Sequence, residues 1–442
     1  MTVAMSPKLI ALEDAVLNQL KGRFTAITDF QARMDMVNSV AKTLNPAVST
    51  EEIQQMFDDM NDMGYIKDLL VNENIEDIMI NNTQNIFVFD SEEGKKKIED
   101  RFVNRIELER FVNRLKLYAT NESNDGNILD VHLPNGSRVN IISSPLGYDI
   151  TIRNFKKTPL SIIDLINDGE LDYSIAARLW LYIDGFKIRP ANVLIGGMPA
   201  AGKTTLLNAM FSFFRPEQRV VTIEETYELD TSMQENAAKL ETSEAMPLES
   251  LVRNVLRMRP DTIIIGEVRG AEANDMITAM NIGKIVLGTI HASSTRDIIN
   301  RLQHTPMNVP MDIIPVIDVL IVISVVYMQG KPHRRVTQIS EVSGMENQVL
   351  LSDLYKFDYK TMRGTPILPS VTYRDLLSKL LGVPAPDILA EERVRAAILE
   401  RLNKLGKKDI GSISQTVKEY YDDPEQTLRS LGLGDMQPVI RV

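Results

Sequence analysis

Gly197-Met198-Pro199-Ala200-Ala201-Gly202-Lys203-Thr204 is the stretch that decides the fold of this 442-residue chain, because it matches the phosphate-binding pattern GxxxxGK[ST]. Glycines let the backbone approach phosphate closely, Lys203 reaches the outer phosphates and the Thr204 hydroxyl sits on Mg²⁺. Residues 192–195 before the loop read as a short apolar strand, and residues 204–210 after it read as a helix whose N-terminus faces the anion. The sequence therefore predicts a P-loop site for ATP and Mg²⁺. Its predicted nucleotide-contacting residues are Gly197, Ala200, Ala201, Gly202, Lys203, Thr204 and Thr205.

Acidic residues follow two further apolar runs. Residues 220–223 lead to Glu224 and Glu225, and residues 262–265 lead through Gly266 to Glu267. A P-loop enzyme needs a carboxylate, or a water held by one, near the end of a neighbouring strand. We therefore predict Glu267, Glu224 and Glu225 as catalytic, and Thr204, Glu224 and Glu225 as metal-binding. The role of Glu228 stays open between the site and plain solubility.

The composition limits the alternatives. Formal net charge is -11, which argues against a broad nucleic-acid-binding surface. There are no cysteines, so disulfides, cysteine-ligated zinc and thiol nucleophiles are excluded, and the four histidines are scattered. We expect no zinc and regard nucleic acid as an improbable partner.

The chain shows no sign of export or of a membrane span. Its start lacks the basic and apolar regions of a signal peptide, and its longest apolar stretch, 313–328, is broken by Pro315, Asp318 and Ser324. That stretch is better interpreted as a buried strand after a turn. We expect a cytoplasmic protein.

The pattern along the chain predicts four parts. Residues 1–60 form a helical lead-in, and residues 61–157 form an α+β domain with a tight turn at 134–137 and a solvated loop at 94–97. A linker at 154–159 leads into an α/β domain, 158–371, in which strands, a glycine-rich loop and helices alternate. Residues 372–442 are predicted to be a helical C-terminal subdomain.

Four sequence blocks in order resemble those of the secretion ATPase superfamily, whose members power type II and type IV secretion, type IV pili and the archaeal swimming filament. The P-loop is followed by an acidic box at 222–229, by an atypical second nucleotide motif at 257–270, and by a histidine box at 288–292 that contains His291. Residues 130–140 and 151–155 are similar to the signature of the family's N-terminal domain. The resemblance covers roughly residues 65–345.

This resemblance implies an α/β fold: a RecA-like P-loop ATPase domain with a smaller α+β N-terminal domain, helical extensions and assembly as a homo-hexamer. By resemblance Glu267 would polarise the attacking water, Glu224 and Glu225 would support the metal and the water, and His291 would sense the γ-phosphate. Arginines of the N-terminal domain would supply positive charge to the nucleotide, and others would act across a subunit boundary. The first group is Arg138 and Arg153, and the second group is Arg253, Arg257 and Arg269.

The chain departs from the family's pattern at two places, and the second, the missing zinc module, favours a resemblance to the archaeal branch. Residues 281–284 lack the Thr-Gly-His that many relatives carry there, which leaves that histidine's role absent or taken by Lys284, and the tetracysteine zinc module is missing. The implied function is a motor for a type IV pilus-like or archaellum filament, or for protein secretion. It would work with a polytopic platform protein at the inner face of the cell membrane. The alternatives are a conjugation-type nucleic-acid transport ATPase and a non-catalytic nucleotide-gated scaffold.

Overall fold

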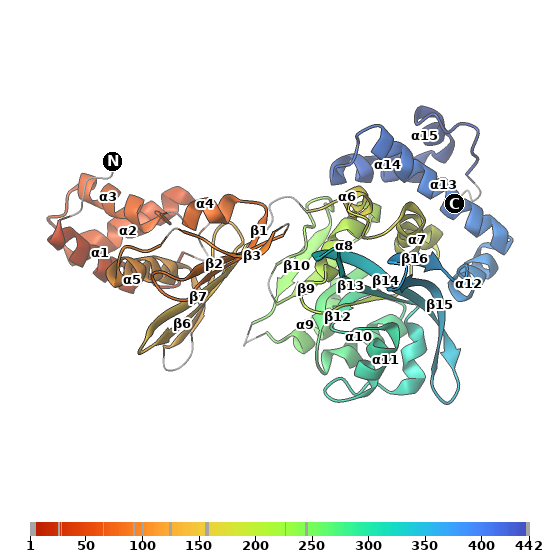
Figure 1. Cartoon of the computed structure of the whole chain (residues 1–442), viewed down its shortest axis with the longest axis horizontal. Helices are drawn as coiled ribbons and strands as arrows, with labels where there is room; N and C mark the ends of the chain where they lie inside the picture. Colours follow the sequence, from red (N-terminus) through yellow and green to blue (C-terminus); the bar gives the residue numbers. More distant parts are fainter. Residues whose placement is uncertain are drawn as a thin grey trace. The chain divides into compact units, whose positions relative to one another are not determined.

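The computed structural model describes residues 6–24, 27, 29–64, 66–91, 93–99, 101–122, 126–154, 159–225, 227–243 and 246–438. The chain divides into two compact units, Met1–Lys157 and Thr158–Val442 (Figure 1). Most of the predicted linker, residues 155–158, lies outside the described residues, as does Thr226 of the acidic box. The division into four parts stays a prediction.

In the first unit, helices and a seven-stranded antiparallel sheet share one core. Ser49 and Glu52 form a capping box that begins the third helix. The lead-in helices and one face of the sheet bury their apolar side chains in the same cluster. The sheet order is β3-β2-β1-β7-β6-β5-β4. The elements are α1 (Pro7–Leu20), α2 (Phe30–Leu44), α3 (Thr50–Met60), α4 (Ile66–Val71), β1 (Ile75–Ile80), β2 (Ile86–Asp90), β3 (Gly94–Lys97), α5 (Arg105–Leu115), η1 (Lys116–Tyr118), β4 (Ala119–Glu122), β5 (Ile128–His132), β6 (Arg138–Ser144) and β7 (Gly147–Arg153).

The prediction of a loop at 94–97 is wrong. These residues form β3, an edge strand that pairs antiparallel with β2. The ammonium nitrogens of Lys95 and Lys97 both lie over the ring of Phe87, 5.8 Å and 6.0 Å from its centroid, as cation–π contacts. Lysines are a common protection for an exposed strand edge, which is why a lysine run can be a strand here.

A buried charge cluster joins three helices of this unit. Nη2 of Arg110 on α5 donates to the Glu13 carboxyl group on α1 at 3.1 Å. The same nitrogen also donates to Asp59 on α3 at 3.0 Å. Arg114 also pairs with Asp59. Burial raises the pKa of Glu13 to about 8, with Asp59 adding to the rise and Arg110 opposing it.

We expect this cluster to make the first unit less stable as the pH rises. The folded unit keeps a proton on Glu13 that the unfolded chain releases above about 4.5. The stabilisation is therefore fully present below that pH and is lost as the pH rises towards about 8. The slope is at most about 1.4 kcal/mol per pH unit. Hydrogen exchange of α1, α3 and α5 in the full chain at pH 6, 7 and 8 should show this loss in the wild type and much less of it in Glu13→Gln. Glu51→Gln, an exposed change on α3, should behave as the wild type does, and identical slopes in all three proteins would contradict the assignment.

The second unit is built on a nine-stranded sheet of order β10-β9-β11-β12-β8-β13-β14-β15-β16, in which β10 to β13 are parallel and β14 to β16 are antiparallel (Figure 1). One apolar core lies on the face covered by α7, α8 and the C-terminal helices, and another on the face covered by α9, α10 and α11. The apolar stretch 313–328 becomes a 3-10 turn and the buried strand β13, in agreement with its interpretation from sequence. The elements up to β13 are α6 (Ile162–Asn167), α7 (Tyr173–Asp184), η2 (Gly185–Lys187), β8 (Val193–Gly196), α8 (Lys203–Met210), η3 (Phe211–Phe213), β9 (Val220–Glu224), β10 (Ala237–Glu241), α9 (Leu248–Val255), η4 (Leu256–Met258), β11 (Thr262–Val268), α10 (Glu272–Asn281), β12 (Ile285–Ile290), α11 (Thr295–Gln303), η5 (Met311–Val316) and β13 (Val319–Met328).

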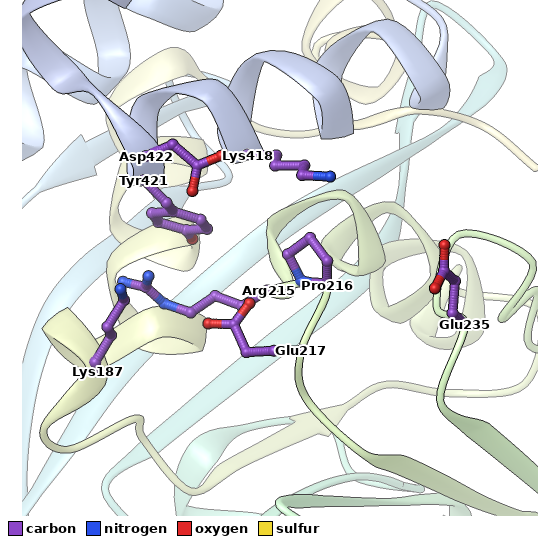
Figure 2. A pocket seen from close by; sticks show the side chains of 8 residues that line it. All are labelled: Lys187, Arg215, Pro216, Glu217, Glu235, Lys418, Tyr421 and Asp422. Atoms are coloured by element: carbon purple, nitrogen blue, oxygen red, sulfur yellow. The ribbon is translucent and has the colours of Figure 1, made fainter.

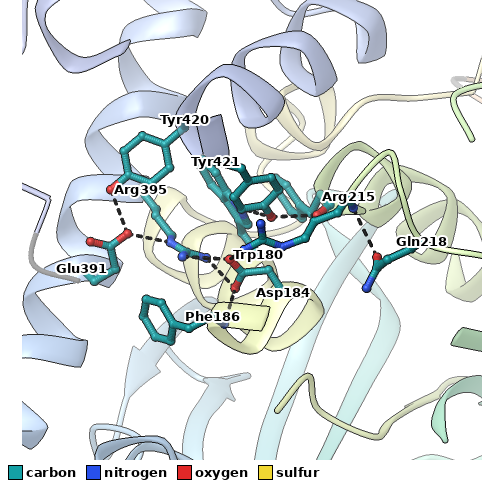
Figure 3. A network of polar contacts seen from close by, with 10 residues as sticks. Trp180, Asp184, Phe186, Arg215, Gln218, Glu391, Arg395, Tyr420 and Tyr421 are labelled. Carbon is teal, nitrogen blue, oxygen red and sulfur yellow. Dashed lines mark hydrogen bonds and ion pairs between the residues drawn. The ribbon is translucent and has the colours of Figure 1, made fainter. Parts of the chain in front are cut away.

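The C-terminal helices are fastened to α7 through buried polar groups (Figure 3). The guanidinium of Arg395 on α13 donates to both carboxylate oxygens of Asp184 at 3.0 Å, and its Nε donates to Glu391 at 3.1 Å. Trp180 of α7 stacks on Phe213 and donates to the Tyr421 hydroxyl at 2.7 Å. The C-terminal helices and the P-loop domain therefore share one core. The remaining elements are β14 (Lys331–Met345), β15 (Val349–Asp358), β16 (Arg363–Pro366), α12 (Thr372–Leu381), α13 (Ala385–Lys404), α14 (Ile410–Asp422) and α15 (Pro424–Ser430).

Within the described ranges, no helix combines the length and the apolar character that a bilayer span requires.

Candidate active site

The loop from β8 to α8 has the backbone that a phosphate site needs. A Cβ at Gly197 would lie 2.7 Å from the carbonyl oxygen of Ile323, so this position has no room for a side chain. Gly202 precedes α8 with a φ of +100°, a left-handed conformation that favours glycine. Ala200 is also left-handed, with a φ of +61°, and Ala201 is buried. Thr204 and Thr205 follow in the first turn of α8, where free backbone N–H groups can receive an anion.

Lys203 lies buried beneath the loop and is held by three acceptors. Its Nζ donates to the carbonyl oxygens of Gly197 at 3.0 Å and Met198 at 3.4 Å, and lies 3.4 Å from Nδ1 of His291. Burial lowers the pKa of Lys203, and the carboxylate of Glu267 opposes that effect. Two of these contacts are long for hydrogen bonds, at 3.4 Å, so phosphate oxygens could replace them as partners of the ammonium group.

Glu267 and His291 form a direct pair across the ends of β11 and β12. His291 Nε2 lies 2.8 Å from Glu267 Oε1. An ammonium can only donate, so Nδ1 of His291 accepts from Lys203 and the ring proton belongs on Nε2, where it points to Glu267. Arg269 donates to the same Glu267 oxygen and binds both oxygens of Glu225 at 3.0 Å. The chain of contacts therefore runs from the P-loop lysine to the two acidic strand ends.

Glu224 is buried at the end of β9, and one of its carboxylate oxygens accepts hydrogen bonds from the backbone. Its Oε1 accepts the backbone N–H groups of Glu228 at 2.8 Å and Leu229 at 3.0 Å, which fixes the turn of the acidic box. No described residue hydrogen-bonds to the buried Oε2. A Cβ at Gly266 would lie 3.1 Å from Glu224 Cγ, so the small residue at 266 is explained by the close approach of Glu224. Burial raises the pKa of Glu224, and the two backbone N–H groups lower it.

The two arginines predicted in the N-terminal domain are neighbours on one sheet. Arg138 of β6 and Arg153 of β7 are register partners, and the row continues to His132 on β5 and Asp77 on β1. Arg153 Nε donates to Asp77 at 3.3 Å. Like charges directly opposite one another on adjacent strands are destabilising, so a bound anion would stabilise this pair. Their role toward the nucleotide stays a prediction.

The remaining basic side chains that the sequence singled out differ in their surroundings. Arg253 is exposed on α9 and pairs with Glu249 and Asp275, and Arg257 is exposed after it. Arg269 is engaged by acidic residues of its own chain, so a role across a subunit boundary would require it to leave them. Lys284 donates to the Pro260 carbonyl oxygen at 3.0 Å, at the opposite end of β12 from His291. Lys284 therefore cannot replace a histidine at the phosphate site.

Sequence reasoning missed Arg334 of β14. Its Nε donates to the Ala200 carbonyl oxygen of the P-loop at 3.1 Å, and its side chain packs against Gly202 beside the buried carboxyl of Glu170. Burial raises the pKa of Glu170 to about 7, and the charge of Arg334 opposes the rise. Arg334 is 134 residues from Ala200. No local motif marks it.

A separate cavity lies away from these residues. It has a volume of about 310 Å³ and lies where the C-terminal helices meet the P-loop domain (Figure 2). Its cationic and acidic side chains are balanced, so it does not favour an anion. It is lined by Lys187, Arg215, Pro216, Glu217, Glu235, Lys418, Tyr421 and Asp422.

The residues of the P-loop and of the ends of β9 and β11 fit a nucleoside triphosphate with Mg²⁺. A glycine without space for a Cβ, a left-handed glycine, the start of α8 and a buried lysine provide a phosphate cradle. The Thr204 hydroxyl and the free oxygen of Glu224 are hard oxygen donors of the kind that Mg²⁺ takes. Three or more His, Asp or Glu side chains placed to hold a metal on their own do not occur among the described residues. A P-loop site does not need such a cluster, because phosphates and water complete the shell.

Comparisons with known proteins identify the family of the chain. A family profile described as "Type II/IV secretion system protein" matches residues 59–333. An uncharacterised protein of Methanocaldococcus jannaschii is 30% identical over 421 residues, which are 90% of this chain and 75% of that protein. A putative conjugal transfer protein of Mycobacterium tuberculosis is 29% identical over 257 residues, 54% of this chain and 72% of its own length.

Among solved structures, the Legionella pneumophila ATPase DotB is 19% identical, with a TM-score of 0.45, over 78% of this chain and 91% of its own. The profile alone spans more than half of the sequence. It confirms the resemblance inferred from the four blocks and the α/β fold class, with a RecA-like P-loop domain, that this resemblance implied. The chain belongs to the type II/IV secretion system protein family, within the secretion ATPase superfamily.

Proposed function

We propose that this protein hydrolyses ATP in a ring of six subunits and uses the cycle to drive a filament or secretion machine at a membrane platform protein. The observation that carries the proposal is the line of contacts from Lys203 through His291 to Glu267. It joins the residue that would bind the outer phosphates to the residue that would act on water. A nucleotide-binding scaffold would need the first residue but not the second.

The chemistry follows from the positions of these groups. The Glu267 carboxylate would accept the proton of the attacking water, and the Nε2–H of His291 and the guanidinium of Arg269 hold that carboxylate as an acceptor. Lys203 would face the negative charge that develops on the transferred phosphoryl group. His291 contacts both Lys203 and Glu267. A phosphate group that draws Lys203 away from His291 would therefore change the surroundings of the side chain that is paired with Glu267. This would let His291 report on the γ-phosphate.

Mg²⁺, when bound, would neutralise phosphate charge, and Thr204 with Glu224 would hold it or its waters. The metal role predicted for Glu225 requires that its carboxylate leave Arg269.

The arginine pair of the first unit would complete the site. Arg138 and Arg153 present two neighbouring positive charges on one face of the sheet. Closure of that domain on a nucleotide, within one subunit or between two, would bring this charge to the phosphates. Such closure is a means to convert hydrolysis into domain movement.

Replacement of Lys203 by alanine tests the nucleotide site. A charge-assisted hydrogen bond contributes about 1.5–3 kcal/mol, so ATP should bind roughly 10- to 100-fold more weakly. Calorimetry with a non-hydrolysable ATP analogue would measure the loss of affinity, and a phosphate-release assay would measure the loss of turnover. Lys187→Ala, a lysine beside the separate cavity, is a suitable control. Full ATP turnover by Lys203→Ala would remove the P-loop from the mechanism.

A conjugation-type motor is the second candidate, supported by the similarity to the putative conjugal transfer protein. Duplex DNA should then stimulate ATP turnover with a steep dependence on salt. The net charge of -11 favours the filament or protein-secretion motor. Turnover that does not respond to DNA would support that choice.

A further inference from the structure

The strands β13 and β14 form a hairpin that lies directly against the P-loop. The Ile323 carbonyl oxygen is the reason that Gly197 has no room for a Cβ, and Arg334 is bonded to the Ala200 carbonyl oxygen. In the sheet, β8 has β12 on one side and β13 on the other. The acidic groups and His291 all follow β9, β11 and β12. The hairpin therefore borders the phosphate loop on the side away from the hydrolytic groups.

One face of this hairpin is apolar and exposed beside the loop. Val325 is the register partner of Arg334, so both side chains project from the same face, and Tyr327 projects from it two residues further on. Val325 is 38% exposed and Tyr327 is 71% exposed. Met198 of the P-loop itself is 56% exposed. These side chains offer apolar surface beside an anion site, which a ligand with an apolar face could cover.

The distances along the strand suit a nucleoside. Arg334 lies at the loop, and Tyr327 lies two residues, or roughly 7 Å, further along the hairpin than Val325. A base joined through ribose to phosphates in the loop extends over a similar length. Aromatic rings accept a base by stacking on its flat face.

We propose that the face of the β13–β14 hairpin formed by Val325, Tyr327 and Arg334 is the wall against which the base of the bound nucleotide packs. The proposal rests on the proposed function, since the loop must bind the phosphates. Tyr327 supplies the stacking surface and Val325 the apolar floor. Arg334 is a positioning residue, because its bond to Ala200 holds the hairpin against the loop.

Binding of ADP and of inorganic pyrophosphate, each with Mg²⁺, separates the base from the phosphates. Both ligands bring two phosphates, and only ADP brings a base. Loss of a base–aromatic stack costs about 1–3 kcal/mol. We expect Tyr327→Ala of the full chain to weaken ADP binding on the order of tenfold and to leave pyrophosphate binding within twofold. Tyr327→Phe should keep the wild-type affinity for both ligands, because the ring is retained.

Tyr359→Ala is the matched control, since Tyr359 is a 60% exposed tyrosine in the turn between β15 and β16. It should bind both ligands as the wild type does. If the Tyr327→Ala protein bound ADP with unchanged affinity, or lost affinity equally for ADP and pyrophosphate, the proposed base-binding wall would be wrong. The phosphate site would not be affected by that result. A wild-type protein that binds neither ligand would overturn the proposed function together with the wall.

Discussion

Replacement of Glu267 by glutamine should lower kcat for ATP hydrolysis by about 10²–10⁴-fold, the usual contribution of a positioned general base. Glutamine has nearly the same shape, and its carbonyl oxygen can still accept from His291 Nε2. Its side chain can no longer take a proton from water. ATP should therefore bind with near wild-type affinity while turnover is lost, which a phosphate-release assay and a binding titration would show together.

Glu249→Gln is a matched control for this change. Glu249 is an exposed glutamate of α9 that pairs with Arg253 and has no contact with the P-loop or Glu267 in the described structure. It should retain full turnover. If the Glu267→Gln protein hydrolysed ATP within threefold of the wild-type rate, the general base would have to be another carboxylate. Glu224 would be the first to examine.

Replacement of Arg395 by alanine should destabilise the second unit by about 3–5 kcal/mol, because it leaves buried carboxylates without their partner. Asp184 is 1% exposed and would keep Arg215 at 3.5 Å and the Phe186 N–H at 3.3 Å, and Glu391 would keep the Tyr420 hydroxyl at 2.8 Å. The Arg395 guanidinium also lies over the rings of Trp180 and Phe186. The effect should include loss of packing as well as charge.

The single tryptophan of the chain makes this measurement local. Trp180 stacks on Phe213 and contacts Tyr420 and Tyr421, so its fluorescence reports whether α7 and the C-terminal helices stay together. Urea unfolding followed by this signal should show the loss in Arg395→Ala. Arg393→Ala, an exposed change on the same helix, should stay within about 0.5 kcal/mol of the wild type. A loss of less than about 1 kcal/mol in the free energy of unfolding of Arg395→Ala would mean that the packing of the C-terminal helices on α7 does not depend on the Arg395–Asp184 ion pair.

The local parts of the site could be predicted from sequence because their spacing is short. The glycines, Lys203 and Thr204 occupy fixed positions within eight residues. Glu224 and Glu267 follow apolar runs that became β9 and β11. The pattern also indicated the buried strand β13.

Other features depend on contacts between distant segments. The loop predicted at 94–97 is an edge strand because Phe87 of β2 offers its ring to two lysines. Arg269 was placed among candidates for a neighbouring subunit, and its contacts in this chain are Glu225 and Glu267. Arg334 is related to the P-loop only through a hairpin that returns to it.

The amino-acid sequence by itself determined that this protein has a phosphate loop, acidic strand ends and a histidine box, because backbone geometry and strand periodicity require particular residues at particular spacings. Tertiary structure decided that His291 contacts both Lys203 and Glu267. Sheet order brings β8, β11 and β12 together, and no spacing along the chain encodes that order. It also decided that Arg395 closes on Asp184 across 211 residues. Buried charges find partners wherever the folded chain supplies them, since leaving one unpaired is costly.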